Sequence, residues 1–236
     1  MSTKLLHMDD FGVVDCDATA VSVGAAEDGR TDIVLDQTCF YARGGGQDWD
    51  TGMIDSFKVE EVRLDADGVV HHIGEGVPPD TGASVHCAVD VARRDINTRL
   101  HSAGHVVDMA NNRVNPDWVP GRGAHYPHMS FVEYTNAEVG ESTAAKFQDE
   151  ITAILSQNVQ NTMKYVSYDE LAALCRHVPA NLPVNKPTRV VLYGDFGVPC
   201  GGTHVQNLAD IGRIEITKIK TKKGMTKVSY RVEGIN

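Results

Sequence analysis

The sequence predicts an α+β protein in which a small β-barrel precedes a domain of antiparallel sheet and helices. Up to about residue 90, short apolar runs alternate with turns rich in Gly, Pro and Asp, at the near-regular spacing typical of a small barrel or sandwich. After Asp90 a helical periodicity begins, and strand-like runs return near the C-terminus. We therefore expect two domains, a Gly-rich β-barrel over residues 1–90 and an α+β domain over 91–236.

The strands of the first domain are expected where apolar and β-branched residues cluster between turns. The segment from Pro78 to Gly82 reads as the turn before the last strand. The expected strands are Asp32–Asp36, Met53–Ile54, Val59–Leu64, Val69–Ile73 and Val85–Val89.

The second domain is expected to open with a helix capped by Asp90 and ended by Asn111-Asn112 and Pro116. Gly104 inside this helix costs about 1 kcal/mol relative to Ala. A helix tolerates that cost where another group must approach its backbone closely. Gly104 therefore marks an expected close contact.

Further elements follow from periodicity and capping. A helix over 142–160 places Phe147, Ile151 and Ile154 on one stripe, together with Leu155 and Val159. Ser167 and Glu170 form a capping box that opens a short third helix. The expected strands are Thr188–Tyr193, Gly212–Ile219 and Lys227–Val232, the last two joined by a turn at Lys222-Lys223-Gly224.

Composition narrows the class of protein. Of the 236 residues 42% are hydrophobic, which supplies a packed core, yet no run of about 18 apolar residues predicts a membrane span. The polar, acidic start does not resemble a signal peptide. Five scattered cysteines, an odd number, favour a reducing compartment with free or metal-bound thiols, so we expect a cytoplasmic protein.

The charge of the whole chain and the charge of one stretch give opposite expectations about nucleic-acid binding. With 22 Lys and Arg against 32 Asp and Glu, the net charge of −10 argues against nucleic-acid binding by the whole surface. One stretch is basic, however, with Glu215 as its only acid. This stretch is either the solvated face of a hairpin or a phosphate-contacting strip, and it contains Arg213, Lys218, Lys220, Lys222, Lys223, Lys227 and Arg231.

Two short motifs carry the strongest chemical signal. His101-Ser-Ala-Gly-His105 and Cys200-Gly-Gly-Thr-His204 each place two metal-binding side chains four positions apart. On a helix such residues share a face, so two pairs can form a tetrahedron of three imidazoles and one thiolate, which suits zinc. The HExxH zinc peptidases are excluded because Ser102 stands where their Glu base would be. A purely structural zinc remains an alternative.

A third feature is the glycine-rich segment from Tyr41 to Gly52. It lacks the Lys-Ser/Thr that a Walker phosphate loop requires. It is either a β-bulge at a barrel corner or a loop whose backbone N–H groups face an anionic or ester substrate, with the Gln47 amide beside them.

Together these residues resemble the alanyl-tRNA editing family, the free-standing AlaX type related to the editing domains of alanyl- and threonyl-tRNA synthetases. The resemblance covers nearly the whole chain and is carried by the segments 40–47, 101–105, 131–134 and 198–205. It implies a small N-terminal β-barrel before an α+β editing domain. It also implies hydrolysis of the ester in mischarged tRNA(Ala), chiefly seryl-tRNA(Ala), with glycyl-tRNA(Ala) left open. Ala42 and the segment 125–130 depart from the family pattern and affect the expected shape of the substrate pocket.

For this reaction we expect Zn²⁺ on His101, His105, Cys200 and His204, where it would polarise the ester or activate a water. Gln47 and the Gly45 and Gly46 backbone are candidates to orient the ester or its oxyanion. Alanine is smaller than serine, so selectivity must come from reading the serine hydroxyl, and Thr38 is the candidate. No carboxylate stands out as general base.

Basic side chains near the metal helix and on the basic stretch are expected to hold the acceptor stem of tRNA by its phosphates. Three alternatives remain: editing of seryl-tRNA(Thr), a non-catalytic RNA-binding module with structural zinc, and a metal-dependent esterase for small molecules. The residues expected to contact tRNA are Arg93, Arg94, Arg99, Lys220, Lys222, Lys223 and Lys227.

Overall fold

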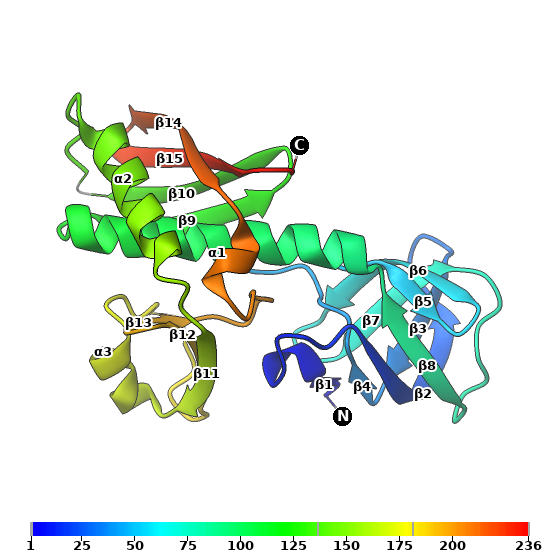
Figure 1. Cartoon of the computed structure of the whole chain (residues 1–236). Coiled ribbons are helices and arrows are strands. Elements are labelled where there is room, and N and C mark those ends of the chain that lie inside the picture. The colour runs from blue at the N-terminus through cyan, green and yellow to red at the C-terminus, as the bar shows by residue number, and fades with distance from the viewer. Residues whose placement is uncertain (1, 136, 181, 236) are drawn as a thin grey trace. The chain divides into compact units, whose positions relative to one another are not determined.

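A computed structural model of the chain describes residues 2–135, 137–180 and 182–235 (Figure 1). The chain divides into two compact units, Met1–Ile96 and Asn97–Asn236. Helix α1 (Val91–Val114) begins in the first unit and continues into the second. The architecture is α+β with a closed barrel, as the sequence predicts.

The first unit contains a closed antiparallel barrel. Its strand order is β2-β3-β7-β6-β5-β8. A short parallel pair, β1 (Lys4–Leu5) with β4 (Gln37–Thr38), and the 3-10 turn η1 (Leu6–Met8) accompany it. The barrel strands are β2 (Asp15–Ala25), β3 (Thr31–Leu35), β5 (Gly52–Ile54), β6 (Phe57–Leu64), β7 (Val70–Glu75) and β8 (Ser84–Val89).

Strand β2 is the one barrel strand without a counterpart among the predicted runs. Its inward positions include Ala18 and Ala20, and Asp15 and Asp17 alternate with them. Ala and Asp are poor β-formers, so the local sequence gives little sign of a strand. Pairing with β3 on one side and β8 on the other holds β2 in place.

A buried ion pair lies inside the first unit. The Arg94 guanidinium bonds Asp50 through Nε and Nη2, and its remaining donors reach the carbonyls of Cys39 (2.6 Å) and Val13 (2.8 Å). Asp50 also accepts the backbone N–H of Tyr41 at 2.7 Å. Removing one partner would leave a buried charge uncompensated. Arg94 therefore holds parts of the first unit together, and the expectation that it contacts tRNA stays a prediction.

The second unit contains two antiparallel sheets. A four-stranded sheet has the order β14-β15-β10-β9, and a three-stranded sheet has the order β11-β12-β13. The strands are β9 (Val119–Tyr126), β10 (Met129–Thr135), β11 (Asn161–Val166), β12 (Thr188–Tyr193), β13 (Phe196–Pro199), β14 (Ile214–Lys222) and β15 (Met225–Val232).

Helix α1 is capped as predicted. The Asp90 carboxylate accepts the N–H groups of Ala92 (3.0 Å) and Arg93 (3.1 Å), which satisfies two donors of the first turn. The helix continues past Asn111-Asn112 to Val114, because its last turns are buried against Trp118 and the sheet. The tertiary contacts thus carry the helix past the two asparagines, and it ends two residues before Pro116, the other predicted stop.

Helix α2 (Thr143–Ser156) buries Phe147, Ile151 and Ile154 of the expected stripe but ends four residues earlier than predicted. Leu155 is only half-buried, and Val159 lies beyond the end of the helix. Asn158 adopts a positive φ of 51°, and Gln160 already pairs with Asn207 as an isolated bridge. The Gln148 amide fastens α2 to β14 by bonding the Ile214 carbonyl and the Ile216 N–H. The three shorter helices of this unit are η2 (Tyr168–Glu170), opened by the predicted capping box, α3 (Leu171–Leu174) and η3 (Leu208–Ile211).

The β14–β15 hairpin closes through the predicted turn. Lys222 pairs with Met225, and the two turn residues, Lys223 (φ 52°) and Gly224 (φ 77°), both have positive φ. This is the pattern of a type I′ turn, which matches the twist of the flanking strands. Within the part of the chain that the structure describes, no helix is both long and apolar enough to cross a membrane.

Candidate metal centre

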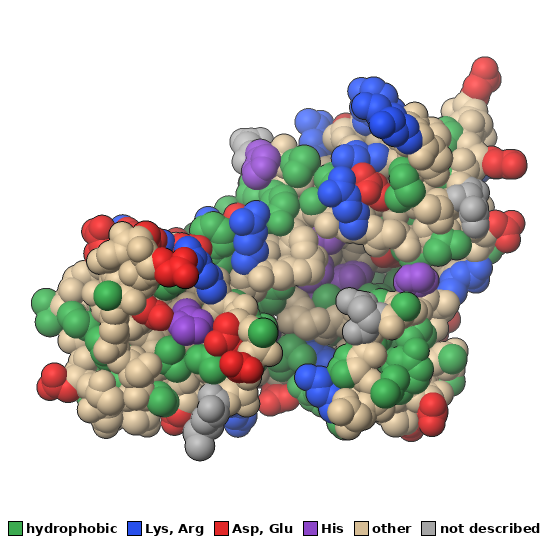
Figure 2. Space-filling model, turned by 180° about the vertical axis from the view of Figure 1, so that it is seen from behind, with side chains coloured by type: hydrophobic (Ala, Val, Ile, Leu, Met, Phe, Trp, Pro, Cys, Tyr) green, Lys and Arg blue, Asp and Glu red, His purple; other side chains and the backbone are tan. Residues whose placement is uncertain are grey.

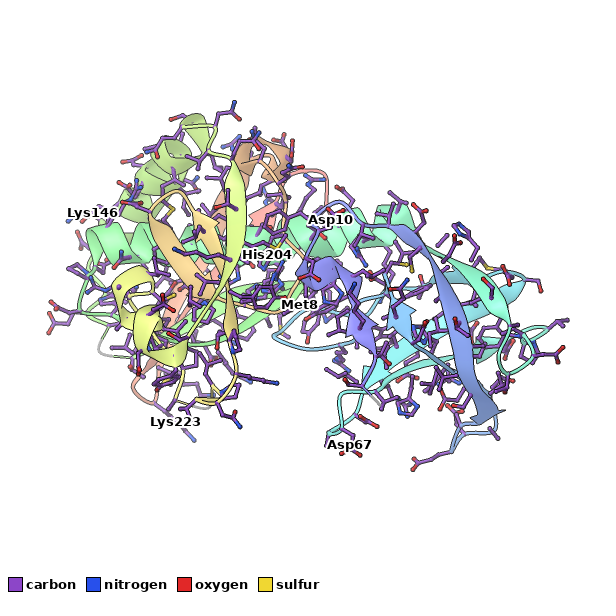
Figure 3. All side chains as sticks on the ribbon, turned by 90° about the horizontal axis from the view of Figure 1, so that it is seen from below. Met8, Asp10, Asp67, Lys146, His204 and Lys223 are labelled. Atoms are coloured by element: carbon purple, nitrogen blue, oxygen red, sulfur yellow. The ribbon has the colours of Figure 1, made fainter. Side chains whose placement is uncertain are left out.

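The structure brings the two predicted metal-binding pairs together in the second unit. Helix α1 supplies His101 and His105, and the loop after β13 supplies Cys200 and His204. One ligand atom from each side chain lies within 4.8 Å of every other. The three histidines are buried and Cys200 is half-buried. Figure 3 shows His204 in the interior of this unit, whereas Lys223 lies at its periphery.

The rings face a common point. The centroid distances are 4.9 Å for His101–His105, 4.8 Å for His101–His204 and 5.2 Å for His105–His204. The Cys200 Sγ lies 3.5 Å from the His101 Nε2. A tetrahedral zinc holds its ligand atoms about 3.3–3.8 Å apart, so the four groups already approach this geometry.

The electrostatics of the cluster suit a cation. Burial lowers the pKa of His105 to about 4 and the pKa of His101 well below its ordinary value. Both imidazoles are therefore neutral at pH 7, the state that ligates metals. Burial also raises the pKa of the Cys200 thiol, while the Gly202 N–H, 3.4 Å from Sγ, favours the thiolate. A metal would complete this stabilisation.

His105 supplies the sharpest test of fit. Both of its ring nitrogens are buried and have no hydrogen-bond partner among the described residues. A buried polar group without a partner is expensive, and native proteins rarely retain one without a ligand or water. A metal bonded to one nitrogen removes half of that penalty. Together with the three-imidazole, one-thiolate donor set, this fits zinc.

The loop that carries Cys200 and His204 is held by the helix of the other pair. The Ser102 hydroxyl accepts the Val205 N–H at 3.0 Å, and the Thr98 and Thr203 hydroxyls bond at 2.7 Å. From β11, the Asn161 side chain donates to the Val205 carbonyl. Ser102, where peptidases carry a Glu base, thus fixes the relative position of the two metal-binding pairs.

Strand β12 contributes two supporting residues that sequence reasoning missed. Arg189 is buried, and its Nη1 donates to the carbonyls of Cys200 and Gly202, each at 2.9 Å. The Tyr193 hydroxyl bonds the His204 Nδ1 at 2.8 Å, which orients that ring. The predicted strand Thr188–Tyr193 held both residues, but nothing local distinguished them from ordinary strand side chains. Neither Gly201 nor Gly202 has a positive φ. The loop that carries Cys200 and His204 therefore turns without a glycine in the left-handed region.

A fourth histidine completes the cluster. His125, on β9, stacks on His101 with centroids 4.9 Å apart. The predicted close approach at Gly104 is made by this residue, because a Cβ at Gly104 would lie 2.3 Å from the His125 Cε1. Gly123 also leaves room for the His125 ring, because a Cβ at this position would collide with that ring. Gly104 was the available sequence signal, although it did not identify His125 as the neighbour.

In the first unit, Thr38 is fully buried on β4. His72 donates from Nδ1 to the Ile33 carbonyl at 3.0 Å, so its Nε2 accepts the Thr38 hydroxyl at 2.8 Å. The Thr38 oxygen also accepts the Phe40 N–H at 3.1 Å. Thr38 thus faces the interior of the first unit, and its hydroxyl proton is already committed to His72.

The glycine-rich loop forms a tight turn. Gly44 and Gln47 pair through their backbones, and Gly45 (φ 52°) and Gly46 (φ 77°) occupy the left-handed region between them. The Tyr41 hydroxyl donates to the Gly44 carbonyl at 2.8 Å. Gly45 is exposed, whereas the Gln47 side chain is fully buried. The turn therefore presents backbone rather than the Gln47 amide.

The predicted tRNA-contacting residues divide into engaged and exposed groups. Arg93 bonds the Trp49 carbonyl and Asp48, and Arg99 bonds the carbonyls of Ile211 and Glu233. The remaining lysines lie on the β14–β15 hairpin, over which Figure 2 shows Lys and Arg side chains gathered. Of these Lys220, Lys222 and Lys223 are exposed, while half-buried Lys227 lies 3.6 Å from the Phe131 ring centroid and 3.5 Å from Glu133.

Comparison with known proteins gives the relationship of the chain. Residues 12–93 match the family of class II (A) tRNA synthetases, and residues 188–228 match the second additional domain of threonyl and alanyl tRNA synthetases. The second match contains Cys200 and His204, and the first contains the barrel strands.

Relatives that match over most of the chain are also tRNA synthetases. The alanine–tRNA ligase of Nitrosopumilus maritimus is 33% identical over 219 residues, covering 86% of this chain and 23% of the ligase. The ligase of Methanocella arvoryzae is 30% identical over 216 residues (85% and 24%), and that of Archaeoglobus fulgidus 28% over 232 residues (93% and 24%). The chain thus spans about a quarter of the length of these curated relatives. These matches show that the chain is related to a region of alanine–tRNA ligases, and they support the resemblance to AlaX-like alanyl-tRNA editing proteins.

Proposed function

We propose that this protein is a zinc-dependent hydrolase that deacylates mischarged tRNA(Ala), chiefly seryl-tRNA(Ala). The observation that supports it most is the convergence of His101, His105, Cys200 and His204, with both ring nitrogens of His105 left without partners. Kinship with alanine–tRNA ligases supports tRNA(Ala) as the carrier. Free thiols at all five cysteines agree with action in the cytoplasm, where aminoacyl-tRNA is found.

In this reaction water adds to the ester carbonyl carbon, and the bond to the ribose oxygen breaks as that oxygen takes up a proton. Bound zinc would polarise the carbonyl or lower the pKa of a water to about 7. The chain's own residues hold the ligands in place: Arg189 fixes the Cys200 loop and Tyr193 orients His204. Because these metal-binding side chains are already held in position, they need not rearrange during the reaction.

Selection of serine over alanine requires a group that reads the serine hydroxyl, because alanine fits any pocket that admits serine. We assign this role to Thr38, whose oxygen retains acceptor capacity after its contacts with His72 and Phe40. The backbone N–H groups of Gly45 and Gly46 are assigned to the ester or its oxyanion. Gln47 is assigned to holding their turn, since its own side chain is buried.

For tRNA binding we assign the exposed lysines of the β14–β15 hairpin. Lys220, Lys222 and Lys223 project from an otherwise acidic protein, and such a local strip attracts phosphates despite the net charge of −10. Arg93 and Arg99 are assigned at most a secondary role, because backbone carbonyls already occupy their guanidinium groups.

The deciding experiment compares hydrolysis of seryl-tRNA(Ala) and alanyl-tRNA(Ala) by the zinc-loaded protein. We expect serine to be released at least about a hundredfold faster. His105→Ala should abolish release while circular dichroism shows an intact fold. His128→Ala, which removes an exposed histidine from the β9–β10 turn, is the matched control. No release by the folded, zinc-loaded protein would refute the proposal.

The same experiment separates the alternatives. Release from seryl-tRNA(Thr) but not from seryl-tRNA(Ala) would indicate threonyl editing. If His105→Ala unfolds the protein and the wild type binds tRNA without hydrolysis, zinc is structural and the protein is an RNA-binding module. Hydrolysis of simple esters with no preference for aminoacyl-tRNA would indicate a small-molecule esterase.

A further inference from the structure

Three of the five cysteines converge at the barrel of the first unit, and none of their thiols has a role in the function proposed above. Cys16 on β2 is the direct partner of Cys87 on β8, and Cys39 follows β4. The Cys39 Sγ lies 3.9 Å from the Cys87 carbonyl oxygen. Cys39 and Cys87 belong to the packed cluster of the barrel interior, and the partly buried Cys16 packs against it.

The three thiols differ in access and in acidity. Cys39 and Cys87 are fully buried, whereas Cys16 is half-buried. Hydrogen bonds from the thiols of Cys39 and Cys87 lower the pKa of Cys16. The same bond to Cys16, followed by burial, raises the pKa of Cys39 and of Cys87. These shifts favour the thiolate, which is the reactive form, on Cys16, the one of the three thiols that solvent reaches.

The two neighbours of Cys16 are not equally able to bond with it. Cys87 is held from both sides, because β8 pairs with β2 through Cys16 and with β5 through Ile54. Cys39 lies in the bend after β4, outside the barrel's strand ladders, with its carbonyl oxygen bonded to Arg94. Forming a disulfide from hydrogen-bonded thiols requires the sulfurs to close to about 2.05 Å. Cys39 is thus the better partner.

We propose that Cys16 is an oxidation-sensitive thiol that forms a disulfide with Cys39 when a peroxide is supplied. The Cys16 thiolate attacks hydrogen peroxide, which gives a sulfenic acid and releases hydroxide. The Cys39 thiol then attacks that sulfur, the S–O bond breaks, and water leaves as the disulfide forms. Two thiols are oxidised and one peroxide is reduced. A thiol reductant reverses the step.

The bond would tie β2 to the segment that carries Thr38, the direct neighbour of Cys39. Oxidation would in this way act on the part of the barrel to which serine selection is assigned above. The chemical proposal itself does not depend on the hydrolase function, because its first readout is the disulfide.

The experiment treats the full chain with hydrogen peroxide, blocks remaining thiols with N-ethylmaleimide and maps the peptides by mass spectrometry. We expect the loss of two hydrogen atoms and one cross-linked peptide that joins Cys16 to Cys39, absent in Cys16→Ser and reversed by dithiothreitol. In Cys39→Ala, dimedone should label Cys16 instead. Cys175→Ala, which removes a buried thiol of the second unit, is the matched control and should leave the cross-link unchanged.

Other patterns would overturn the proposal. A cross-link from Cys16 to Cys87, or oxidation confined to Cys200, contradicts it, as does a Cys16–Cys39 bond that forms only in urea. The wild-type peptide map decides among these outcomes even if a variant folds poorly. Loss of serine release on oxidation would then be tested separately, so failure of the hydrolase proposal leaves the disulfide result intact.

Discussion

The His125 ring stacks on the His101 ring with their centroids 4.9 Å and their planes 13° apart. The Tyr230 hydroxyl donates to the Leu100 carbonyl at 2.9 Å, so it accepts from the His125 Nδ1 at 2.6 Å. That second bond fixes the His125 tautomer and the plane of its ring. His125 thus sets the orientation of a metal-binding side chain without being one of the four converging groups.

Removing His125 should therefore weaken zinc binding. We expect His125→Ala to lower zinc affinity by about 10- to 100-fold, the range typical of outer-shell partners. His125→Phe should have a smaller effect, because it keeps an aromatic face against His101. Competition with a chromogenic chelator measures the affinity. Equal affinity in His125→Ala and in the exposed control His128→Ala would contradict this role.

Gly104→Ala tests the close packing between α1 and β9. In an exposed helix this change would stabilise by about 1 kcal/mol. Here the new Cβ would lie 2.3 Å from the His125 Cε1, so we expect destabilisation by about 1–3 kcal/mol and weaker zinc binding. Urea unfolding measures the change. Gly24→Ala is the control, because nothing lies within 4 Å of a Cβ at that position.

The buried His72 should make the protein sensitive to acid. Burial lowers the pKa of His72 to about 4, against about 6.5 in the unfolded chain. Between these values the unfolded state binds the extra proton, so the contribution to stability is complete above pH 6.5. It disappears as the pH falls to 4, a change of up to about 3 kcal/mol.

Proton NMR of the metal-free protein checks this assignment. We expect the His72 ring to stay neutral to near pH 4. His86 is the internal control, because its hydrogen bond with Asp17 raises its pKa above the ordinary value. Protonation of His72 at or above the His86 midpoint would contradict the prediction.

The hairpin lysines should act on substrate binding and not on the chemical step. We expect the triple change of Lys220, Lys222 and Lys223 to Ala to raise KM for tRNA and leave kcat within about twofold. The slope of log KM against log salt should fall by about 1 for each phosphate that the protein no longer neutralises. Lys146→Ala, on an exposed face of α2, is the control. An unchanged salt slope would show that the hairpin does not bind tRNA.

Thr38→Val tests the reading of the serine hydroxyl. The change removes the acceptor oxygen and also leaves the His72 Nε2 without its partner, so we expect a loss of serine-over-alanine selectivity and a destabilisation of about 1–3 kcal/mol. Thr38→Ser keeps the hydroxyl and should retain selectivity. Kinetics with both charged tRNAs distinguish the two effects. Full selectivity in a folded Thr38→Val protein would exclude the assigned role.

Features that depend on nearest neighbours along the chain could be predicted from the sequence. Asp90 capped α1, Lys223-Gly224 closed a two-residue hairpin, and a helix placed His101 and His105 on one face, because capping, turn chemistry and helical spacing are local. The fold class followed from the spacing of such elements.

Other features depend on contacts between distant parts of the chain, and no local sequence pattern specifies them. β2 exists as a strand only because two neighbours pair with it, and Arg94 is buried only because Asp50, 44 residues earlier in the chain, pairs with it. Likewise Gly104 indicated a close approach, but only the packing of β9 on α1 showed that His125 makes it. Each of these interactions joins residues far apart in the chain, and their energy comes from burial that exists only once the fold has formed.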